Sequence, residues 1–368
     1  MKVLHVISSG GMYGAEAVIL NLLRTMRHGP HEASLGIFHN AANPNRQFYE
    51  TASREGFAPK QIECSGQVDR GTIRVIRELA ATERADVIHA HGYKADIYSW
   101  FAVRGRVPLV STCHTWYDTD FFVTLYGKAD RFVLRNFQRV VSVSDEVTQQ
   151  LLGAGVRAER IRMVRNGIDL RPFDAERVVS DPEAEIVVGL VGRLAWEKGV
   201  DVFLSAAARL VNEFPRAKFV VAGEGPDAEK LARMLDELKI RGRAELLGRR
   251  EDMPAVYRSL DIMVSASRQE GLPIAILEGM ASRLPLVATT VGEVPTVVRD
   301  GVTGFVVPPD DVDALAGAIG KLLGDATLRE QFGTAGRKVI EEQYSAARMT
   351  AEYLRIYEEA IAAAGPRK

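Results

Sequence analysis

The segment Ile186-Val187-Val188-Gly189-Leu190-Val191 runs directly into Gly192-Arg193-Leu194-Ala195-Trp196-Glu197-Lys198-Gly199. The first part is a short apolar run rich in β-branched residues, which predicts a buried strand. The second part has a glycine at each end and predicts a tight turn, and residues 200–214 have the apolar spacing of a helix. Strand, glycine turn and helix in this order open a doubly wound α/β domain.

The N-terminus has the same order of elements. Residues 3–7 predict a buried strand, the turn contains Gly10 and Gly11, and residues 15–26 predict a helix. The turn is not a G-x-G-x-x-G with an acidic residue about 20 positions later, so a dehydrogenase is disfavoured. Its adjacent glycines would let the backbone approach a ligand closely, and a tight turn without a ligand is the alternative. The repeat predicts an α/β protein of two Rossmann-like, doubly wound parallel-sheet domains that face one another across a cleft.

The chain length also favours two domains. At 368 residues it exceeds the size at which a single hydrophobic core usually stops growing. We expect an N-terminal domain over residues 1–172 and a C-terminal domain over residues 173–344. Residues 345–368 predict a final helical segment with an apolar stripe.

The composition excludes several classes of protein. A net charge of −1 argues against wholesale nucleic-acid binding. Cys64 and Cys113 have no metal-ligand spacing, so neither a disulfide framework nor a zinc site is predicted, which suits the cytoplasm. The N-terminal apolar run is too short for a signal peptide, and no run reaches the roughly 18 apolar residues of a membrane span. We therefore expect a cytoplasmic protein whose only form of membrane contact is peripheral.

Two carboxylates stand out in the segment 268–281. Glu270 follows a predicted strand, and Pro273 suits the first position of the helix after it. Glu278 is the only charged residue in the apolar run 271–282, so it needs a partner if that helix is buried. Such a helix start could hold an anion and a polyol. Alternatively, Glu270 only complements the helix dipole, and Glu278 faces solvent or a core partner.

Other polar groups fall at the ends of predicted strands, where open α/β sheets bind ligands. Arg193 and Lys198 beside a helix N-terminus suit a diphosphate, and solvated surface cations are the alternative. The pairs Gly223-Glu224 and Gly248-Arg249 follow the next strands and would border a nucleotide base.

The N-terminal half carries weaker signals. His91 and His114 each fall at the end of a predicted strand, and two histidines at adjacent strand ends indicate a ligand site as often as a structural role, whereas a lone histidine is usually structural. Asp118 and Asp120 have the D-x-D spacing of a metal–diphosphate site, but the sequence places too few further oxygen ligands, so no metal is predicted. Residues 121–139 predict a basic amphipathic segment that either packs on the sheet with its arginines solvated or touches lipid.

Together these motifs resemble those of the retaining glycosyltransferases of the GT-B fold known as family four. The resemblance covers nearly the whole chain, and each of its motifs is weak by itself. The motif at Glu270 and Glu278 matches the E-x7-E pattern of the family. The others, in order, are Gly10-Gly11, His114, Asn166-Gly167-Ile168-Asp169, Gly192-Arg193, Lys198-Gly199 and Gly223-Glu224-Gly225-Pro226.

The resemblance implies roles for these residues. Arg193 and Lys198 would bind the diphosphate of a nucleotide-sugar, Glu278 its ribose and Glu270 the transferred sugar. His114 would contact the donor sugar and completes a catalytic set with Glu270, Arg193 and Lys198. The wider donor site would comprise Gly10, Gly11, Gly223, Glu224, Gly248, Arg249, Gly271, Leu272, Pro273 and Ile274.

The implied reaction moves a hexosyl unit from a nucleotide-sugar, with a UDP-sugar favoured, to a lipid-linked or polysaccharide acceptor. It proceeds with retention, without a metal, and with the leaving phosphate accepting the proton of the acceptor. The family also returns its last helix to the N-terminal domain. A nucleotide-sugar 2-epimerase of the same fold and a non-catalytic binding protein are the alternatives. One departure is Thr296, which stands where the family commonly has Glu, and Glu293 is a candidate for the same space.

Overall fold

The computed structural model describes residues 1–9, 11, 14–27, 29–40, 46–64, 69–113, 121–174 and 184–365. The chain divides into two compact units, unit 1 (Met1–Gly167 with Ala346–Lys368) and unit 2 (Ile168–Ser345). The sequence-based boundary between residues 172 and 173 lies beyond this one, because the segment Ile168–Asp174 packs with unit 2.

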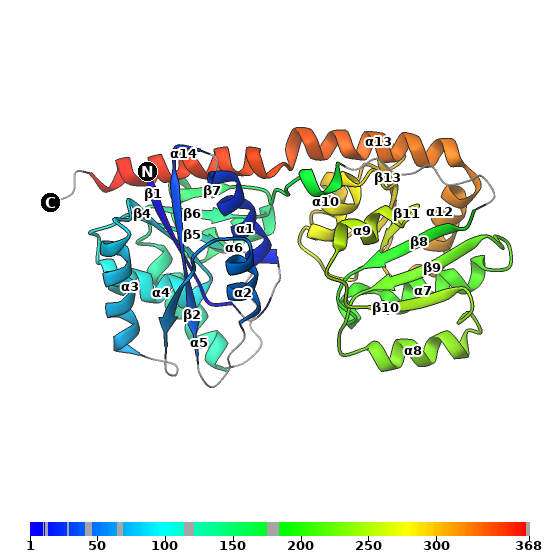
Figure 1. Ribbon diagram of the computed structural model, residues 1–368, viewed down its shortest axis with the longest axis horizontal. Coiled ribbons are helices and arrows are strands. Elements are labelled where there is room, and N and C mark those ends of the chain that lie inside the picture. Colours follow the sequence, from blue (N-terminus) through cyan, green and yellow to red (C-terminus); the bar gives the residue numbers. More distant parts are fainter. Residues whose placement is uncertain are drawn as a thin grey trace. The chain divides into compact units, whose positions relative to one another are not determined.

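Unit 1 is built on a seven-stranded parallel sheet with the order β3-β2-β1-β4-β5-β6-β7. Helices cover both faces (Figure 1), because alternate residues of each buried strand point to opposite cores. Ile88 and Ala90 pack with α3 and α4, whereas Val87 packs with α1 and α14. The strands are β1 (Lys2–Ile7), β2 (Glu32–His39), β3 (Lys60–Glu63), β4 (Val87–His91), β5 (Leu109–Cys113), β6 (Arg139–Ser142) and β7 (Ile161–Met163). The helices are α1 (Gly14–Met26), α2 (Gln47–Arg54), α3 (Arg70–Thr82), α4 (Tyr93–Val103), α5 (Phe121–Leu134), α6 (Asp145–Gly153) and α14 (Ala346–Ala364).

Unit 2 repeats this plan with a six-stranded parallel sheet in the order β10-β9-β8-β11-β12-β13. Ile262 and Val264 point to the core with α7, α8 and α12, whereas Met263 points to the core with α9, α10 and α13. The strands are β8 (Ile186–Val191), β9 (Ala217–Ala222), β10 (Ala244–Gly248), β11 (Ile262–Ser265), β12 (Leu286–Thr289) and β13 (Gly304–Val307). The helices are α7 (Val200–Leu210), α8 (Ala228–Glu237), α9 (Met253–Arg258), α10 (Ile274–Ala281), α11 (Val294–Val297), α12 (Val312–Gly324) and α13 (Ala326–Gln343).

The prediction of two doubly wound parallel α/β domains is confirmed, and two local details were wrong. The helix expected over residues 200–214 ends at Leu210, since Pro215 disfavours helical backbone before it. Pro273 is the N-cap of α10 rather than its first helical residue, with an extended ψ of 128°.

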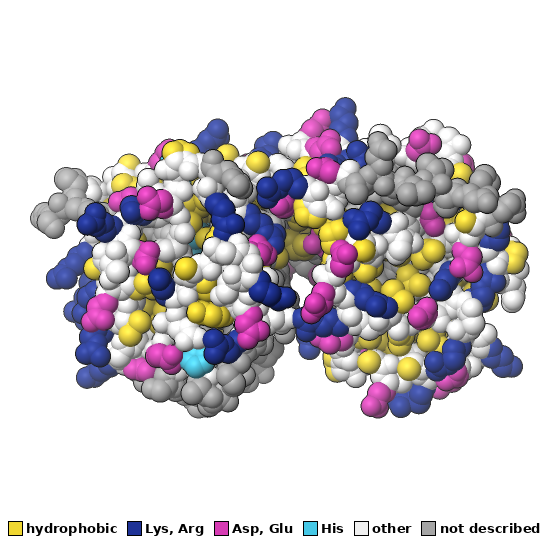
Figure 2. Space-filling view, viewed as in Figure 1, with side chains coloured by type: hydrophobic (Ala, Val, Ile, Leu, Met, Phe, Trp, Pro, Cys, Tyr) yellow, Lys and Arg dark blue, Asp and Glu magenta, His cyan; other side chains and the backbone are white. Residues whose placement is uncertain are grey.

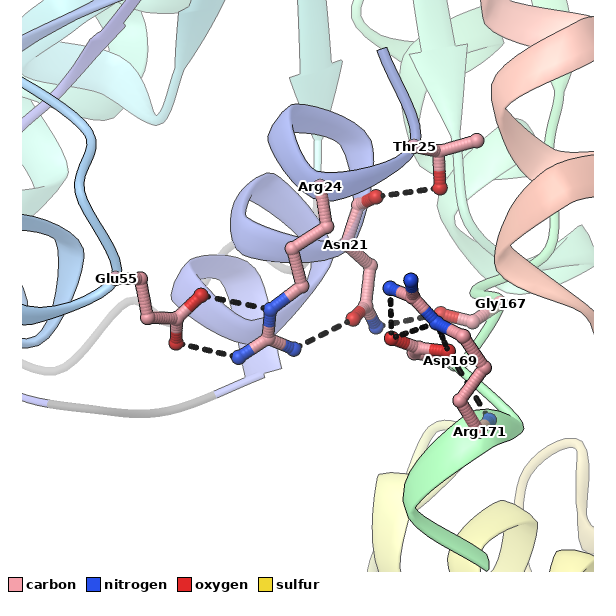
Figure 3. Close-up of polar contacts among 7 residues, drawn as sticks. All are labelled: Asn21, Arg24, Thr25, Glu55, Gly167, Asp169 and Arg171. Carbon is pink, nitrogen blue, oxygen red and sulfur yellow. Dashed lines mark hydrogen bonds and ion pairs between the residues drawn. The ribbon is translucent and has the colours of Figure 1, made fainter. Parts of the chain in front are cut away.

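The chain leaves unit 1 at Gly167, within one of the family motifs. Asn21 of α1 donates to the Gly167 carbonyl oxygen at 3.0 Å and accepts from Arg24 Nη1 at 3.1 Å (Figure 3). In unit 2, Arg171 donates to both carboxylate oxygens of Asp169 (Figure 3). The chain passes from unit 1 to unit 2 between Gly167 and Asp169. A side chain of unit 1 binds the Gly167 end, and a side chain of unit 2 binds the Asp169 end.

Acidic and basic side chains are interspersed over the face shown in Figure 2. Within the ranges that the structure describes, no helix has both the length and the apolar character needed to cross a bilayer.

Candidate functional site

The loops that follow β8, β9, β11 and β12 meet at the carboxyl edge of the sheet of unit 2, and glycines allow them to do so. A Cβ atom added to Gly223, whose φ is +155°, would lie 1.8 Å from the carbonyl oxygen of Gly192. At Gly199, with φ +61°, it would lie 1.9 Å from the Ala266 oxygen, and at Gly292 it would lie 2.0 Å from the Glu270 oxygen. These contacts fix the backbones of four loops against one another.

Glu270 and Lys198 meet at the centre of these loops. The Lys198 ammonium forms an ion pair with Glu270 Oε1, which also accepts a hydrogen bond from Ser267 Oγ at 3.2 Å. The side chains are 14% exposed for Glu270 and 23% exposed for Lys198. A phosphate drawn to this ammonium and a sugar hydroxyl drawn to this carboxylate would therefore be neighbours.

Arg193 lies in the same turn as Lys198 but reaches solvent. Its side chain is 61% exposed, and Nη1 is 3.9 Å from Glu197 Oε1. An exposed ion pair of this length stabilises the fold little, so the guanidinium can exchange Glu197 for an anionic ligand.

Glu278 sits in α10 and has a partner that the sequence did not identify. Tyr257 of α9, which is fully buried, donates its hydroxyl to Glu278 Oε2 at 2.7 Å. Burial raises the pKa of the Glu278 carboxyl to about 7, and the hydrogen bond from Tyr257 partly offsets this rise. The sequence showed that a carboxylate in this apolar helix needs a donor, but Tyr257 lies on another helix, and spacing gave no sign of it.

The groups expected beside a base also come together. Gly223 N–H donates to the Gly248 carbonyl oxygen at 3.0 Å. Gly248 has φ +69°, and Arg249 Nη1 lies 3.4 Å from Glu224 Oε1 with both side chains exposed. Glu224 and Arg249 therefore form a polar rim at this end of the loop cluster.

The start of α10 is tied to the loop after β12. The Gly271 carbonyl oxygen accepts from Glu293 N–H at 3.0 Å, while Leu272 and Ile274 pack against the core beneath. Thr296 Oγ1 donates to the Glu293 carbonyl oxygen at 2.7 Å and lies 3.4 Å from its carboxylate. The buried Glu293 is thus hydrogen-bonded to the residue that follows Glu270, and Thr296 is hydrogen-bonded to Glu293 in turn.

In unit 1, Gly10, His114 and the Asp118–Asp120 motif lie outside the residues that the structure describes. Gly11 is described, and its N–H lies 3.3 Å from Ser9 Oγ. Ser9 Oγ also donates to Glu16 Oε1 at 2.7 Å, and the Glu16 side chain is buried in the first turn of α1. The sequence analysis did not identify Ser9 and Glu16, which hold this turn.

Unit 1 also contains a histidine cluster, His5, His89 and His91, whose ligand atoms lie within 4.8 Å of one another. His5 Nδ1 is 3.2 Å from His91 Nε2. The nitrogens of His89 contact the hydroxyls of Tyr357, at 2.8 Å, and Thr112, at 2.7 Å. A metal ion at this cluster would have to displace one of these hydroxyls. Burial lowers the pKa of His5 to about 3, so this imidazole is neutral.

Two family models match consecutive halves of the chain. "Glycosyltransferase Family 4" matches residues 12–171, and "Glycosyl transferases group 1" matches residues 173–339. The fold and these matches define the chain as a glycosyltransferase.

Curated relatives agree. An alpha-D-kanosaminyltransferase of Streptomyces kanamyceticus is 30% identical over 314 residues, which are 79% of this chain and 80% of that protein. A D-inositol 3-phosphate glycosyltransferase of Mycobacterium marinum is 33% identical over 290 residues, but the match spans only 60% of its length and 71% of this chain. The chain belongs to glycosyltransferase family 4, as the sequence motifs predicted.

Solved structures show the same fold. Anabaena Alr3699/HepE in complex with UDP superposes with a TM-score of 0.82 at 21% identity, covering 96% of this chain and 99% of that one. Sucrose-phosphate synthase from Thermosynechococcus elongatus gives a TM-score of 0.77 at 18% identity, covering 98% and 99%. The predicted GT-B fold is therefore confirmed.

Proposed function

We propose that this glycosyltransferase moves a hexosyl unit from a UDP-sugar to a lipid-linked or polysaccharide acceptor, in the cytoplasm, with retention and without a metal. The observation that carries the proposal is the meeting of Lys198 with Glu270 at a glycine-lined loop cluster. A cation for a diphosphate and a carboxylate for a sugar are thus side by side. The structural relative Alr3699/HepE is described in complex with UDP-glucose, which supports a uridine donor.

The chemistry follows from these charges. When the glycosyl–phosphate bond breaks, negative charge grows on the leaving diphosphate, and positive charge grows on the anomeric carbon. Lys198 and Arg193 stabilise the first charge and Glu270 the second, and such preorganised groups are usually the largest catalytic contribution. The acceptor oxygen attacks from the face of the departing phosphate, which takes its proton, so no separate base is needed. Glu278 accepts hydrogen bonds from the ribose.

The test begins with mass spectrometry of nucleotide that co-purifies with the protein, followed by a hydrolysis screen over nucleotide-sugars in EDTA. We expect bound UDP, turnover of one UDP-hexose, and NMR detection of the retained anomer in transfer to acceptor. A 2-epimerase would instead interconvert nucleotide-sugars without an acceptor, and a binding protein would show no turnover. Failure to bind any nucleoside diphosphate at neutral pH would overturn the proposal.

The proposed lipid-linked acceptor is supported by an aromatic patch on α4 and α5. Phe132 is 58% exposed and Phe101 39% exposed, and both rings contact Trp100. Lys94 and Lys128 lie on the same helices, and aromatic rings with cations suit an anionic membrane surface. Sedimentation with phosphatidylglycerol vesicles should fall on Phe132→Ser, with phosphatidylcholine vesicles as the control. Equal sedimentation of wild type and variant would exclude this surface.

A further inference from the structure

Arg268 stands two residues before Glu270 and is a charged side chain that is only 10% exposed. Its Nη1 and Nη2 atoms donate to the two oxygens of Asp201 at 2.9 and 2.8 Å. Its Nε donates to Asp310 Oδ1 at 2.7 Å, and Nη1 also donates to the Trp196 carbonyl oxygen at 2.7 Å. Four of the five N–H groups of the guanidinium are therefore used within the protein.

The partners of Arg268 belong to separate segments. Trp196 opens the short turn Trp196–Lys198, Asp201 lies in the first turn of α7, and Asp310 follows β13. The guanidinium carbon also lies 5.3 Å from the centre of the Trp196 ring. A backbone hydrogen bond also joins Arg268 to the turn Trp196–Lys198, because Arg268 N–H donates to the Glu197 carbonyl oxygen at 2.8 Å.

The charges around Arg268 make this connection stiff. Burial opposes ionisation of Asp201, but the hydrogen bonds and charge of Arg268 outweigh it and hold the pKa of that carboxyl below its usual value. A planar guanidinium fits a carboxylate with two parallel hydrogen bonds, which fix direction as well as distance. The segment that carries Glu270 is thereby fixed to the turn that carries Lys198.

We propose that Arg268 is a positioning residue that holds Lys198 in register with Glu270, so that the diphosphate and sugar of one donor meet both groups together. This inference rests on the proposed function of that pair. Arg268 acts through Lys198, and its loss should matter only while Lys198 is present. A lysine at 268 keeps the charge but loses the fork, so it should not restore the register.

Arg337 offers a matched control in the same unit. Its side chain is 8% exposed, it is ion-paired with Asp174 and Glu341, and Nη1 donates to the Ala281 carbonyl oxygen at 2.8 Å. Arg337→Gln removes a comparably buried guanidinium. Arg337 connects α13 to α10, whereas Arg268 connects two loops of the proposed donor site. It should lower the melting temperature without weakening UDP binding by the folded protein.

The experiment is calorimetric titration of UDP into wild type, Arg268→Gln, Arg268→Lys, Arg337→Gln and Lys198→Ala, with both Arg268 variants repeated in the Lys198→Ala background. We expect Arg268→Gln and Arg268→Lys to weaken UDP binding roughly tenfold or more, since small misplacements of binding groups have large effects. In the Lys198→Ala background the change should be under about twofold, because coupled residues are not additive.

The proposal would be overturned if Arg268→Lys bound UDP with wild-type affinity. It would also be overturned if Arg268→Gln weakened UDP binding as much in the Lys198→Ala background as in the wild type. If Arg268→Gln does not fold, the same comparison is made with Arg268→Lys, whose effect on UDP binding is measured in the presence of Lys198 and in the Lys198→Ala background. If wild type itself binds no UDP, the proposed function fails. If wild type binds and only Lys198→Ala weakens binding, the function stands and Arg268 has a purely structural role.

Discussion

The histidine cluster of unit 1 (His5, His89 and His91) and the glutamate pair of unit 2 (Glu270 and Glu278) both consist of ionisable groups that are largely buried. The two sets differ in whether their polar atoms remain available to a ligand. The histidines are 0–3% exposed and make contacts with one another and with Thr112 and Tyr357. Glu270, by contrast, is 14% exposed and pairs with a cation that is itself partly exposed. Glu278 accepts one hydrogen bond from Tyr257 and keeps acceptor capacity for a ribose.

The difference teaches that a position near a strand end does not by itself mark a functional group. His91 ends β4, yet its ring packs against those of His5 and His89, and His89 is bonded to Tyr357 of α14. The loops of unit 2 instead combine glycine close contacts with partly exposed opposite charges. The contacts of the histidine cluster therefore favour a role in stability, and donor binding by Glu270 and Glu278 stays our proposal.

The largest expected effect comes from Glu270→Gln. Removing this charge takes away the group that faces the growing positive charge, so kcat should fall on the order of 10²- to 10³-fold. UDP binding should be largely kept, because the substitution leaves Glu278, Arg193 and Lys198, the proposed ribose and diphosphate ligands, in place. Steady-state kinetics and UDP titration test this. Unchanged turnover would mean that the glutamate pair is no more functional than the histidine cluster.

A Cβ atom at Gly223 should damage both fold and site. Gly223→Ala places the methyl group against the backbone oxygen of Gly192, at 1.8 Å before relaxation, in a backbone conformation that side chains rarely adopt. We expect a loss of unfolding free energy on the order of 2–4 kcal/mol. The control is Gly317→Ala within α12, where a Cβ meets nothing within 4 Å. Equal urea unfolding midpoints for the two variants would show that the loops are not closely fixed.

Donor binding should depend on pH through Glu278. With its pKa raised to about 7, this carboxyl becomes protonated as pH falls from 8 to 6 and loses acceptor capacity. The KM for the donor should rise about tenfold at pH 6, where roughly a tenth of the carboxyl groups are ionised. Because folding raises this pKa, the contribution of Glu278 to stability changes in the opposite sense and improves as pH falls toward 4.5. Glu278→Gln should flatten the KM profile, and an unaltered slope would contradict the assignment.

The smallest effect is expected from Tyr357→Phe in the histidine cluster. The substitution leaves His89 Nδ1 without its hydroxyl at 2.8 Å, which should cost about 1–2 kcal/mol of unfolding free energy. UDP affinity should stay at the wild-type value. Thermal unfolding and UDP titration on the same sample test this. A clear loss of UDP affinity without loss of stability would reverse the comparison between the two clusters.

Local sequence patterns predicted the elements that repeat in the fold. The strand–glycine–helix repeats anticipated β1 with α1 and β8 with α7, because apolar runs and glycines encode these elements locally. The same patterns could not pair Tyr257 with Glu278, Arg268 with Asp201, or Ser9 with Glu16. The first two pairs join different helices or loops, and tertiary packing decides which of these lie side by side. The roles of Gly10 and His114 stay predictions, since both lie outside the described residues.

The central claim is that the loop cluster around Lys198 and Glu270 binds the nucleotide of the donor. Calorimetric titration of UDP into wild type, Lys198→Ala and Tyr357→Phe at pH 8 tests it most directly. We predict that wild type and Tyr357→Phe bind UDP equally, and that Lys198→Ala binds it about tenfold or more weakly through loss of a charged contact. Equal affinity in all three proteins, or no binding to wild type, would contradict the claim.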